Sequence, residues 1–218
     1  MESIQHEMYN DFLDNYRNEY DWIFVCDVDE FLHLTNHADI KSLFDDMPCY
    51  DNFDEVLVNW WNISSPDVYY TPKSVQERFT HHDIDKSVFH GGNLNKDCHV
   101  KCFIKGKSDI KFMNNNVHMA KSDKMCNACG GGVMIHEKFP YFTFQFCHSV
   151  MYLKHYWSKS FTEFFYRKIR FWGNTEVTID TANEVKEKYI YESGYWSENH
   201  EKAFQNIIKK VVTNMEKT

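Results

Sequence analysis

Two aspartates, Asp27 and Asp29, follow a run of apolar residues and are the clearest candidates for chemistry in this sequence. Residues 22–26 are all apolar or aromatic and predict a strand buried on both faces, whose end is where open α/β sheets bind ligands. Because strand side chains alternate, we expect the carboxylates of Asp27 and Asp29 on one side of the strand and Val28, which anchors the strand, on the other side. Two like charges this close repel unless a divalent cation lies between them and an anionic substrate. Hard oxygen ligands favour Mn²⁺ (or Mg²⁺) over Zn²⁺, so the pattern predicts such a site, with a solvated acidic turn as the alternative.

Three later stretches combine aromatic rings, amides and cations in short runs. Aromatic faces beside amide donors suit a sugar, which offers C–H patches and hydroxyls. Cationic side chains neutralise a pyrophosphate together with a metal ion, and a neutral imidazole completes a two-carboxylate metal site. Taken singly, each residue also fits core packing or a solvated surface. The candidates are Asn59, Trp60, Trp61 and Asn62 for sugar or acceptor binding, Arg78, Lys101, His118 and Lys159 for binding the diphosphate of a donor, and His155 for the metal.

Helix and strand patterns around these residues indicate an α/β protein. An amphipathic helix that packs on the sheet is predicted by Ile4, Met8, Phe12 and Tyr16, which recur at helical spacing with Tyr9, Leu13 and Tyr20 beside them. Strands are predicted at residues 54–63, 99–105, 110–119 and 139–150. Further helices are predicted at 40–47, from a capping box at 160–163 to Gly173, and at about 198–215, with one more between the last two. The length favours one domain, 1–218, with a helical C-terminal segment from about residue 158.

The overall composition narrows the class of partner. A net charge of -8 and a pI near 5.8 argue against non-specific binding to nucleic acid or anionic lipid. The sequence has neither an 18-residue apolar stretch nor a signal-peptide pattern, so we expect no membrane segment and a soluble, by default cytoplasmic, chain.

Seven cysteines form an odd set without repeated spacing, which favours reduced thiols over a disulfide framework. Cys126 and Cys129 make the pair Cys-x-x-Cys, for which a metal or redox site is the alternative to a loop with free thiols.

Six spaced segments follow an order found in one known family. They are 22–32, 58–65, 77–80, 100–104, 116–118 and 153–164. In this order they resemble glycosyltransferase family 92, within the family-2-like group of GT-A enzymes. The resemblance implies an α/β fold with a GT-A-like mixed sheet flanked by helices, a nucleotide-sugar donor, by family default a UDP-sugar, and a glycan or other hydroxyl acceptor.

The same resemblance implies roles for individual residues. Asp27 and Asp29 would hold a manganese-type cation against the diphosphate, and an inverting transfer would need a carboxylate that deprotonates the acceptor hydroxyl. Glu77 is the first candidate for this base, followed by Asp83 and Asp85 in the long loop 66–95. Residues 155–160 look like the family's His-Tyr-x-x-Lys-Ser signature, which makes His155 a further metal or diphosphate contact and Lys159 a phosphate partner.

The sequence departs from the family pattern at two places. A GT-A domain normally has a βαβ region before the Asp-x-Asp strand, whereas about twenty residues precede Trp22, so we expect an N-terminally truncated fold. The chain is then a fragment, works with a partner chain that supplies the missing half, or has lost catalysis. Pro66 also stands where similar proteins tend to have glycine.

Two other readings of the function stay open. The first is a non-catalytic sugar- or protein-binding remnant of the fold. The second is a haloacid-dehalogenase-like (HAD-like) phosphatase with Asp27 as nucleophile, although no later apolar strand ends in paired acids to complete its magnesium site, and Phe31 stands where Thr or Val is expected.

Overall fold

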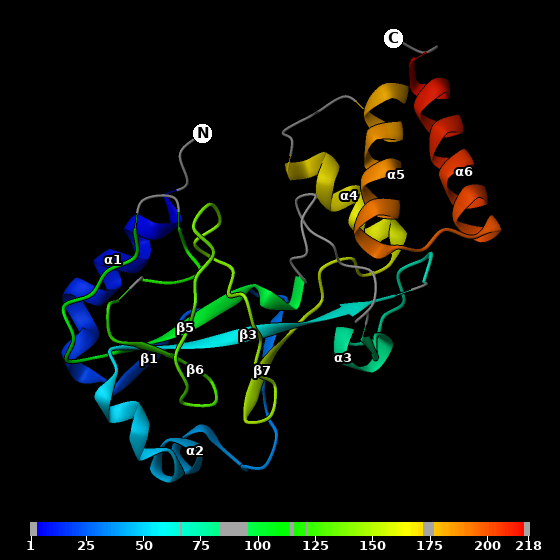
Figure 1. Ribbon diagram of the computed structural model, residues 1–218. Helices are drawn as coiled ribbons and strands as arrows, with labels where there is room; N and C mark the ends of the chain where they lie inside the picture. The colour runs from blue at the N-terminus through cyan, green and yellow to red at the C-terminus, as the bar shows by residue number, and fades with distance from the viewer. Residues whose placement is uncertain are drawn as a thin grey trace. The chain divides into compact units, whose positions relative to one another are not determined.

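The sheet is organised around one long strand, β3 (Glu55–Ser64). The computed structural model describes residues 4–65, 67–82, 96–113, 116–120, 122–171 and 177–215. Within these residues the sheet has seven strands, of which five follow the order β1-β5-β3-β7-β2, and β4 and β6 pair with β3 beside this path (Figure 1). The others are β1 (Trp22–Phe24), β2 (Glu30–Leu34), β4 (His81–His82), β5 (Val100–Lys105), β6 (Met125–Asn127) and β7 (Met151–His155).

The sheet is mixed, as the resemblance implies. β5 pairs with β1 and β3 in antiparallel fashion, whereas β6 and β7 run parallel to β3. Together with six α-helices among the described residues, this makes a mixed α/β structure. The chain divides into two compact units, the first formed by Met1–Asn62 and Ser87–His155 and the second by Ile63–Lys86 and Tyr156–Thr218.

Alternation along β3 builds the core of the first unit on both faces of the sheet. Val56 and Val58 point into a cluster that includes Leu43 of α2 (Ile40–Asp46). Leu57 points the other way, into a cluster that includes Leu13 of α1 (Gln5–Tyr16). The two helices therefore cover opposite faces, because successive strand side chains alternate.

Helix α1 forms where the spacing predicts it and packs on the sheet, as predicted. Leu13 and Tyr9, two of the predicted apolar residues, make this contact. Ile4, Met8, Phe12 and Tyr16 are exposed, so the prediction is wrong for these four.

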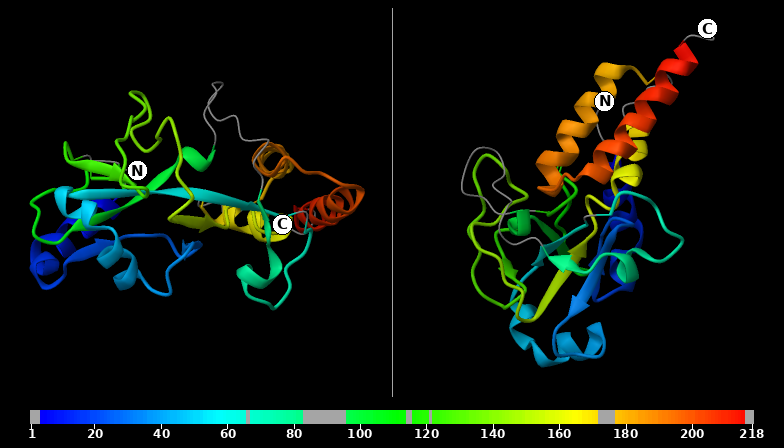
Figure 2. Two further views of the ribbon diagram at one scale, coloured as in Figure 1. Left: turned by 60° about the horizontal axis from the view of Figure 1, so that its bottom comes forward. Right: turned by 90° about the vertical axis from the view of Figure 1, so that its right-hand side faces the viewer.

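The second unit contains a helical cluster. It comprises α4 (Phe161–Phe171), α5 (Ile179–Ser193) and α6 (Glu198–Met215), and α5 and α6 lie side by side (Figure 2). The short helix α3 (Val75–Arg78) also belongs to this unit. The predicted capping box begins α4: Ser160 Oγ donates to Glu163 Oε2, and the Glu163 N–H donates back to Ser160 Oγ (3.4 Å). Aromatic residues of α4 pack on Tyr189 of α5. Each buried Phe of this kind stabilises by roughly 1.5–3 kcal/mol.

Two predicted strands are wrong, and the predicted reduced state holds for five cysteines but not for Cys129 and Cys147. Residues 110–119 form no strand in their described part, and in 139–150 only Phe142 and Thr143 make isolated bridges. Cys129 and Cys147 form a disulfide, with Cα atoms 6.2 Å apart, rather than staying reduced. Cys126 is a free, buried cysteine, so the Cys-x-x-Cys residues do not act as a pair. Among the described residues no helix combines the length and apolar character needed to cross a bilayer.

Candidate functional site

Residues 27–30 form a tight turn between β1 and β2. The Glu30 N–H donates to the Asp27 carbonyl (3.1 Å), and the Asp27 N–H donates to Glu30 Oε2 (2.7 Å). Because β1 has already ended at Phe24, strand alternation does not set the directions of Asp27 and Asp29. Val28 is 99% exposed, so the prediction that it anchors the opposite side is wrong. The turn presents half-buried Asp27 and Asp29.

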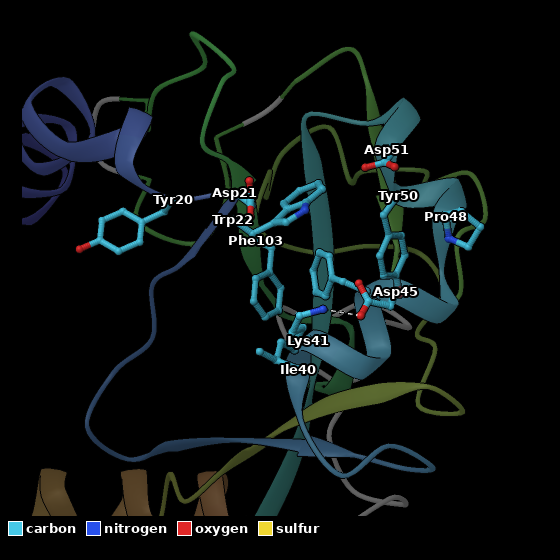
Figure 3. Close-up of a pocket in the computed structure, with 11 residues that line it drawn as sticks. Tyr20, Asp21, Trp22, Ile40, Lys41, Asp45, Pro48, Tyr50, Asp51 and Phe103 are labelled. Carbon is cyan, nitrogen blue, oxygen red and sulfur yellow. Dashed lines mark hydrogen bonds and ion pairs between the residues drawn. The ribbon is translucent and has the colours of Figure 1, made fainter.

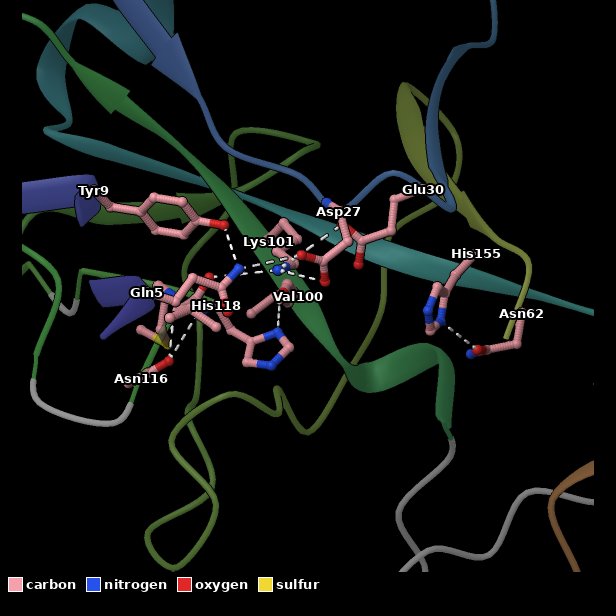
Figure 4. Close-up of polar contacts among 12 residues, drawn as sticks. Gln5, Tyr9, Asp27, Glu30, Asn62, Val100, Lys101, Asn116, His118 and His155 are labelled. Atoms are coloured by element: carbon pink, nitrogen blue, oxygen red, sulfur yellow. Dashed lines mark hydrogen bonds and ion pairs between the residues drawn. The ribbon is translucent and has the colours of Figure 1, made fainter. Parts of the chain in front are cut away.

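A wholly buried lysine, Lys101 of β5, contacts this turn (Figure 4). Its Nζ donates to Asp27 Oδ2 (3.1 Å) and lies 3.9 Å from Glu30 Oε2. Gln5 Nε2 also donates to Asp27, at 3.4 Å. A buried ammonium is tolerated only beside compensating charge, so the two carboxylates hold Lys101 in the interior. We call Asp27, Asp29, Glu30 and Lys101 the acidic-turn cluster.

Glu30 is the most buried acid of the acidic-turn cluster. Burial, with smaller contributions from the charges of Asp27 and Asp29, raises the pKa of Glu30 to about 7, although Lys101 and the hydrogen bond from the Asp27 N–H act to lower it. Its second oxygen, Oε1, has no hydrogen-bond donor among the described residues. Glu30 is therefore close to half protonated at neutral pH.

His118 lies beside this cluster as a neutral imidazole. Its Nδ1 donates to the Val100 carbonyl (3.2 Å). Burial, and then the charge of Lys101, lowers the pKa of His118 to about 4. The fold thus brings Asp27, Lys101 and His118, which are far apart in sequence, into one region of the first unit (Figure 4).

The amides predicted to bind sugar are used inside the fold. Asn59 is wholly buried, donates to Thr143 Oγ1 (3.0 Å) and accepts from the Cys147 N–H (3.2 Å). Asn62 donates through its backbone N and its Nδ2 to Asp97 Oδ1 (2.9 Å each). The prediction that polar residues on β3 need partners is confirmed, because buried amides left unpaired are costly.

The two tryptophans of β3 differ in exposure. Trp60 is buried, and its indole lies between the rings of His99 (4.1 Å between centroids) and His155 (3.9 Å). Its Nε1 is buried without a partner among the described residues. Trp61 is half-buried and stacks on Tyr152 (4.7 Å). Of the four sugar-binding candidates, Trp61 offers the most ring surface.

Glu77, Arg78 and Lys159 belong to the second unit. Glu77 is exposed in a capping box with Ser74, whose hydrogen bonds lower the pKa of Glu77. Arg78 is nearly buried and makes a two-pronged ion pair with Glu163. Lys159 has a left-handed backbone (φ 51°). Asp83 and Asp85 lie outside the described residues.

The predicted metal ligands are not assembled into one group. The described residues contain no set of three or more His, Cys, Asp or Glu side chains arranged to hold a metal ion. His155 instead donates through Nδ1 to Asn62 Oδ1 (3.2 Å). Both oxygens of Asp27 accept hydrogen bonds, Oδ1 from Gln5 and Oδ2 from Lys101. Mg²⁺ commonly takes one or two carboxylates from a protein and its remaining ligands from phosphate and water.

Sequence reasoning missed Glu30 and Asp97 as parts of this region. Glu30 directly follows the Asp-x-Asp pattern, but only the turn folds it under Asp27 and toward Lys101. Asp97 lies 35 residues from Asn62 and is almost wholly buried beneath it. An acid in a polar loop carries no sequence signal of burial.

Comparison with protein-family models finds no match, and comparison with curated proteins finds no significant match.

Proposed function

We propose that this protein is a metal-dependent glycosyltransferase that transfers a sugar from a nucleoside-diphosphate donor to an acceptor hydroxyl, with inversion. Asp27 and Asp29 hold a divalent cation, Mn²⁺ or Mg²⁺, against the donor diphosphate. When bound, the cation supplies Lewis-acid stabilisation of the charge that develops on the leaving diphosphate. The donor is a UDP-sugar by resemblance, and the acceptor is a glycan or another hydroxyl compound.

The proposal depends on one feature, the pairing of a surface carboxylate with a buried cation. Asp27 is 40% exposed at its side chain, whereas the Lys101 ammonium 3.1 Å away is wholly buried. The Lys101 ammonium offsets one carboxylate charge and Glu30 is partly neutral, so a divalent cation at the turn leaves a positive balance. That balance favours a diphosphate, because charge-assisted contacts to phosphate are among the strongest polar contacts.

The reaction is a direct displacement at the anomeric carbon. The acceptor oxygen attacks the anomeric carbon as the bond from that carbon to the diphosphate oxygen breaks. A carboxylate takes the proton of the acceptor hydroxyl, and the nucleoside diphosphate leaves. Glu77 is the first candidate for this base, with Asp83 and Asp85 next.

A second candidate function is a non-catalytic sugar- or protein-binding role. The internal use of Asn59 and Asn62, together with the unassembled metal ligands, favours it. A HAD-like phosphatase is the third candidate, and covalent phosphorylation of Asp27 by a phosphate analogue would identify it.

Thermal unfolding in the presence of MnCl₂ and UDP tests the transferase proposal. At ligand concentrations about 100 times Kd, binding adds about 2.7 kcal/mol, which raises Tm by roughly 5–10 °C for a chain of this size. We expect this shift to require both ligands and to disappear in Asp27→Asn and Asp29→Asn.

The matched control is Asp123→Asn, which changes an exposed aspartate elsewhere in the first unit. It should keep the full shift. An unchanged Tm in the unmodified protein, or an equal shift in all three variants, would contradict a donor site at the turn and would favour the non-catalytic role.

A further inference from the structure

Five large apolar side chains form an exposed line along α1 and the turn that follows it. Their exposed fractions are 65% for Ile4, 64% for Met8, 40% for Phe12, 48% for Tyr16 and 49% for Tyr20. Residues four apart lie on one helix face, and the rings of Phe12 and Tyr16 are 5.3 Å apart. Scattered apolar residues are normal on a surface, but a continuous line of this kind marks an interaction site.

The opposite side of α1 packs on the core of the first unit, so the helix cannot rotate to bury this line. Leu13 is buried in the core, and the Tyr9 ring packs 5.4 Å from that of Phe112. Asn10 exchanges two hydrogen bonds with the Phe112 backbone (2.8 and 2.9 Å). The Arg17 guanidinium donates to three backbone carbonyls. Helix α1 therefore has two apolar faces, of which the fold uses one.

A hollow of about 560 Å³ lies beyond the end of this line, among residues of the sheet face that α2 covers (Figure 3). Tyr20 is a lining residue of the hollow, but its ring stacks with Phe12 (6.3 Å) and points away from the other lining residues. Aromatic and aliphatic walls enclose the hollow, which is large enough for a bulky side chain. These walls are Trp22, Ile40, Phe44, Tyr50 and Phe103.

Acidic side chains flank both the line and the hollow. Glu7, Asp11, Asp14, Glu19 and Asp21 are all exposed, whereas Arg17, the one basic residue between Ile4 and Asp21, is buried. Asp45 and Asp51 line the hollow as well. Lysines pair with some of these acids: Lys111 with Asp14 (2.6 Å) and Lys41 with Asp45 (2.6 Å). The surface therefore combines apolar contact area with an excess of negative charge.

We propose that this surface, the exposed line of α1, docks a basic amphipathic helix of another polypeptide. α1 is about 18 Å long, which matches three to four turns of a partner helix laid against it. Apolar side chains of the partner contact the line, and flanking Lys or Arg residues meet the acids. A second copy of this chain brings its own acids against the same acids, which charge repulsion opposes. This docking is independent of the proposed transferase activity.

The test measures binding of a fluorescent 18-residue synthetic peptide by anisotropy. The peptide carries Leu at alternating three- and four-residue spacing and Lys on its remaining positions, and a matched peptide has Glu in place of Lys. We expect saturable binding of the Lys peptide, at least tenfold weaker binding of the Glu peptide, and weakening at high salt.

Variants of the full chain assign the binding to this surface. Phe12→Ser with Tyr16→Ser, and separately Met8→Ser, which alters one highly exposed side chain, should each weaken binding at least fivefold while circular dichroism stays unchanged. Tyr191→Ser removes a 60% exposed tyrosine of α5 and should leave binding intact, as should Asp27→Asn.

Three results would overturn the proposal. The first is equal binding of the two peptides, or binding that the α1 variants leave unchanged. The second is self-association that Met8→Ser abolishes in sedimentation, which would assign the surface to a second copy. The third is binding to phosphatidylcholine vesicles that the same variant abolishes, which would assign it to a lipid surface.

Discussion

Replacement of Glu30 by glutamine should remove a specific part of the pH dependence of stability. In the folded protein burial raises the pKa of Glu30 from 4.5 to about 7. Above pH 4.5 the unfolded chain releases this proton while the folded protein keeps it, so stability falls as pH rises through this window. The full effect is about 3 kcal/mol, of which about 2.5 kcal/mol falls between pH 5 and pH 8.

The assay is urea unfolding followed by tryptophan fluorescence at pH 5, 6, 7 and 8. Relative to the unmodified protein, Glu30→Gln should gain about 2.5 kcal/mol in unfolding free energy between the first and last pH. Any cost of the glutamine that does not depend on pH cancels in this difference. His118 has a lowered pKa and contributes stability that rises with pH between about 4 and 6.5, but it is present in both proteins.

Glu187→Gln is the matched control, because it makes the same chemical change at an exposed glutamate of α5. It should keep the pH profile of the unmodified protein. If Glu30→Gln kept that profile too, Glu30 would not titrate as a buried group, and the description of the acidic-turn cluster would be wrong.

Two further predictions concern bonds outside this cluster. The double variant Cys129→Ser, Cys147→Ser should lower the unfolding free energy by about 2–4 kcal/mol, because the disulfide restricts the unfolded chain. Urea unfolding under non-reducing conditions measures this loss. An unchanged midpoint, or two free thiols on alkylation of the unmodified protein, would show that the bond does not form. Arg78→Met should lower the unfolding free energy of the protein by about 1–3 kcal/mol and raise the pKa of Glu163, which Arg78 and Ser160 now lower. Measuring the unfolding free energy as the pH is lowered checks the second effect. The same loss of stability at acid pH in the variant and the unmodified protein would refute it.

Local patterns predicted the elements whose residues interact with near neighbours in the chain. The segment 54–63, apolar on both faces except for Asn59 and Asn62, became β3, and the capping box at Ser160 and Glu163 began α4. The predicted strand at 110–119 failed although two of its apolar residues, Phe112 and Met119, are buried. Phe112 and Met119 cover one face of the sheet from an irregular segment, and burial alone does not distinguish such a segment from a strand.

The sequence by itself determined that this protein has an α/β fold, where most of its helices and longest strand lie, and that Asp27 and Asp29 follow an apolar strand. Only the tertiary structure decided that Lys101 lies buried 3.1 Å from Asp27, that Glu30 is folded beneath the turn, and that α1 exposes its apolar line. The physical reason is distance along the chain. Periodicity and capping act over a few residues, whereas Asp27 and Lys101 are 74 residues apart and meet only because β1 and β5 pair.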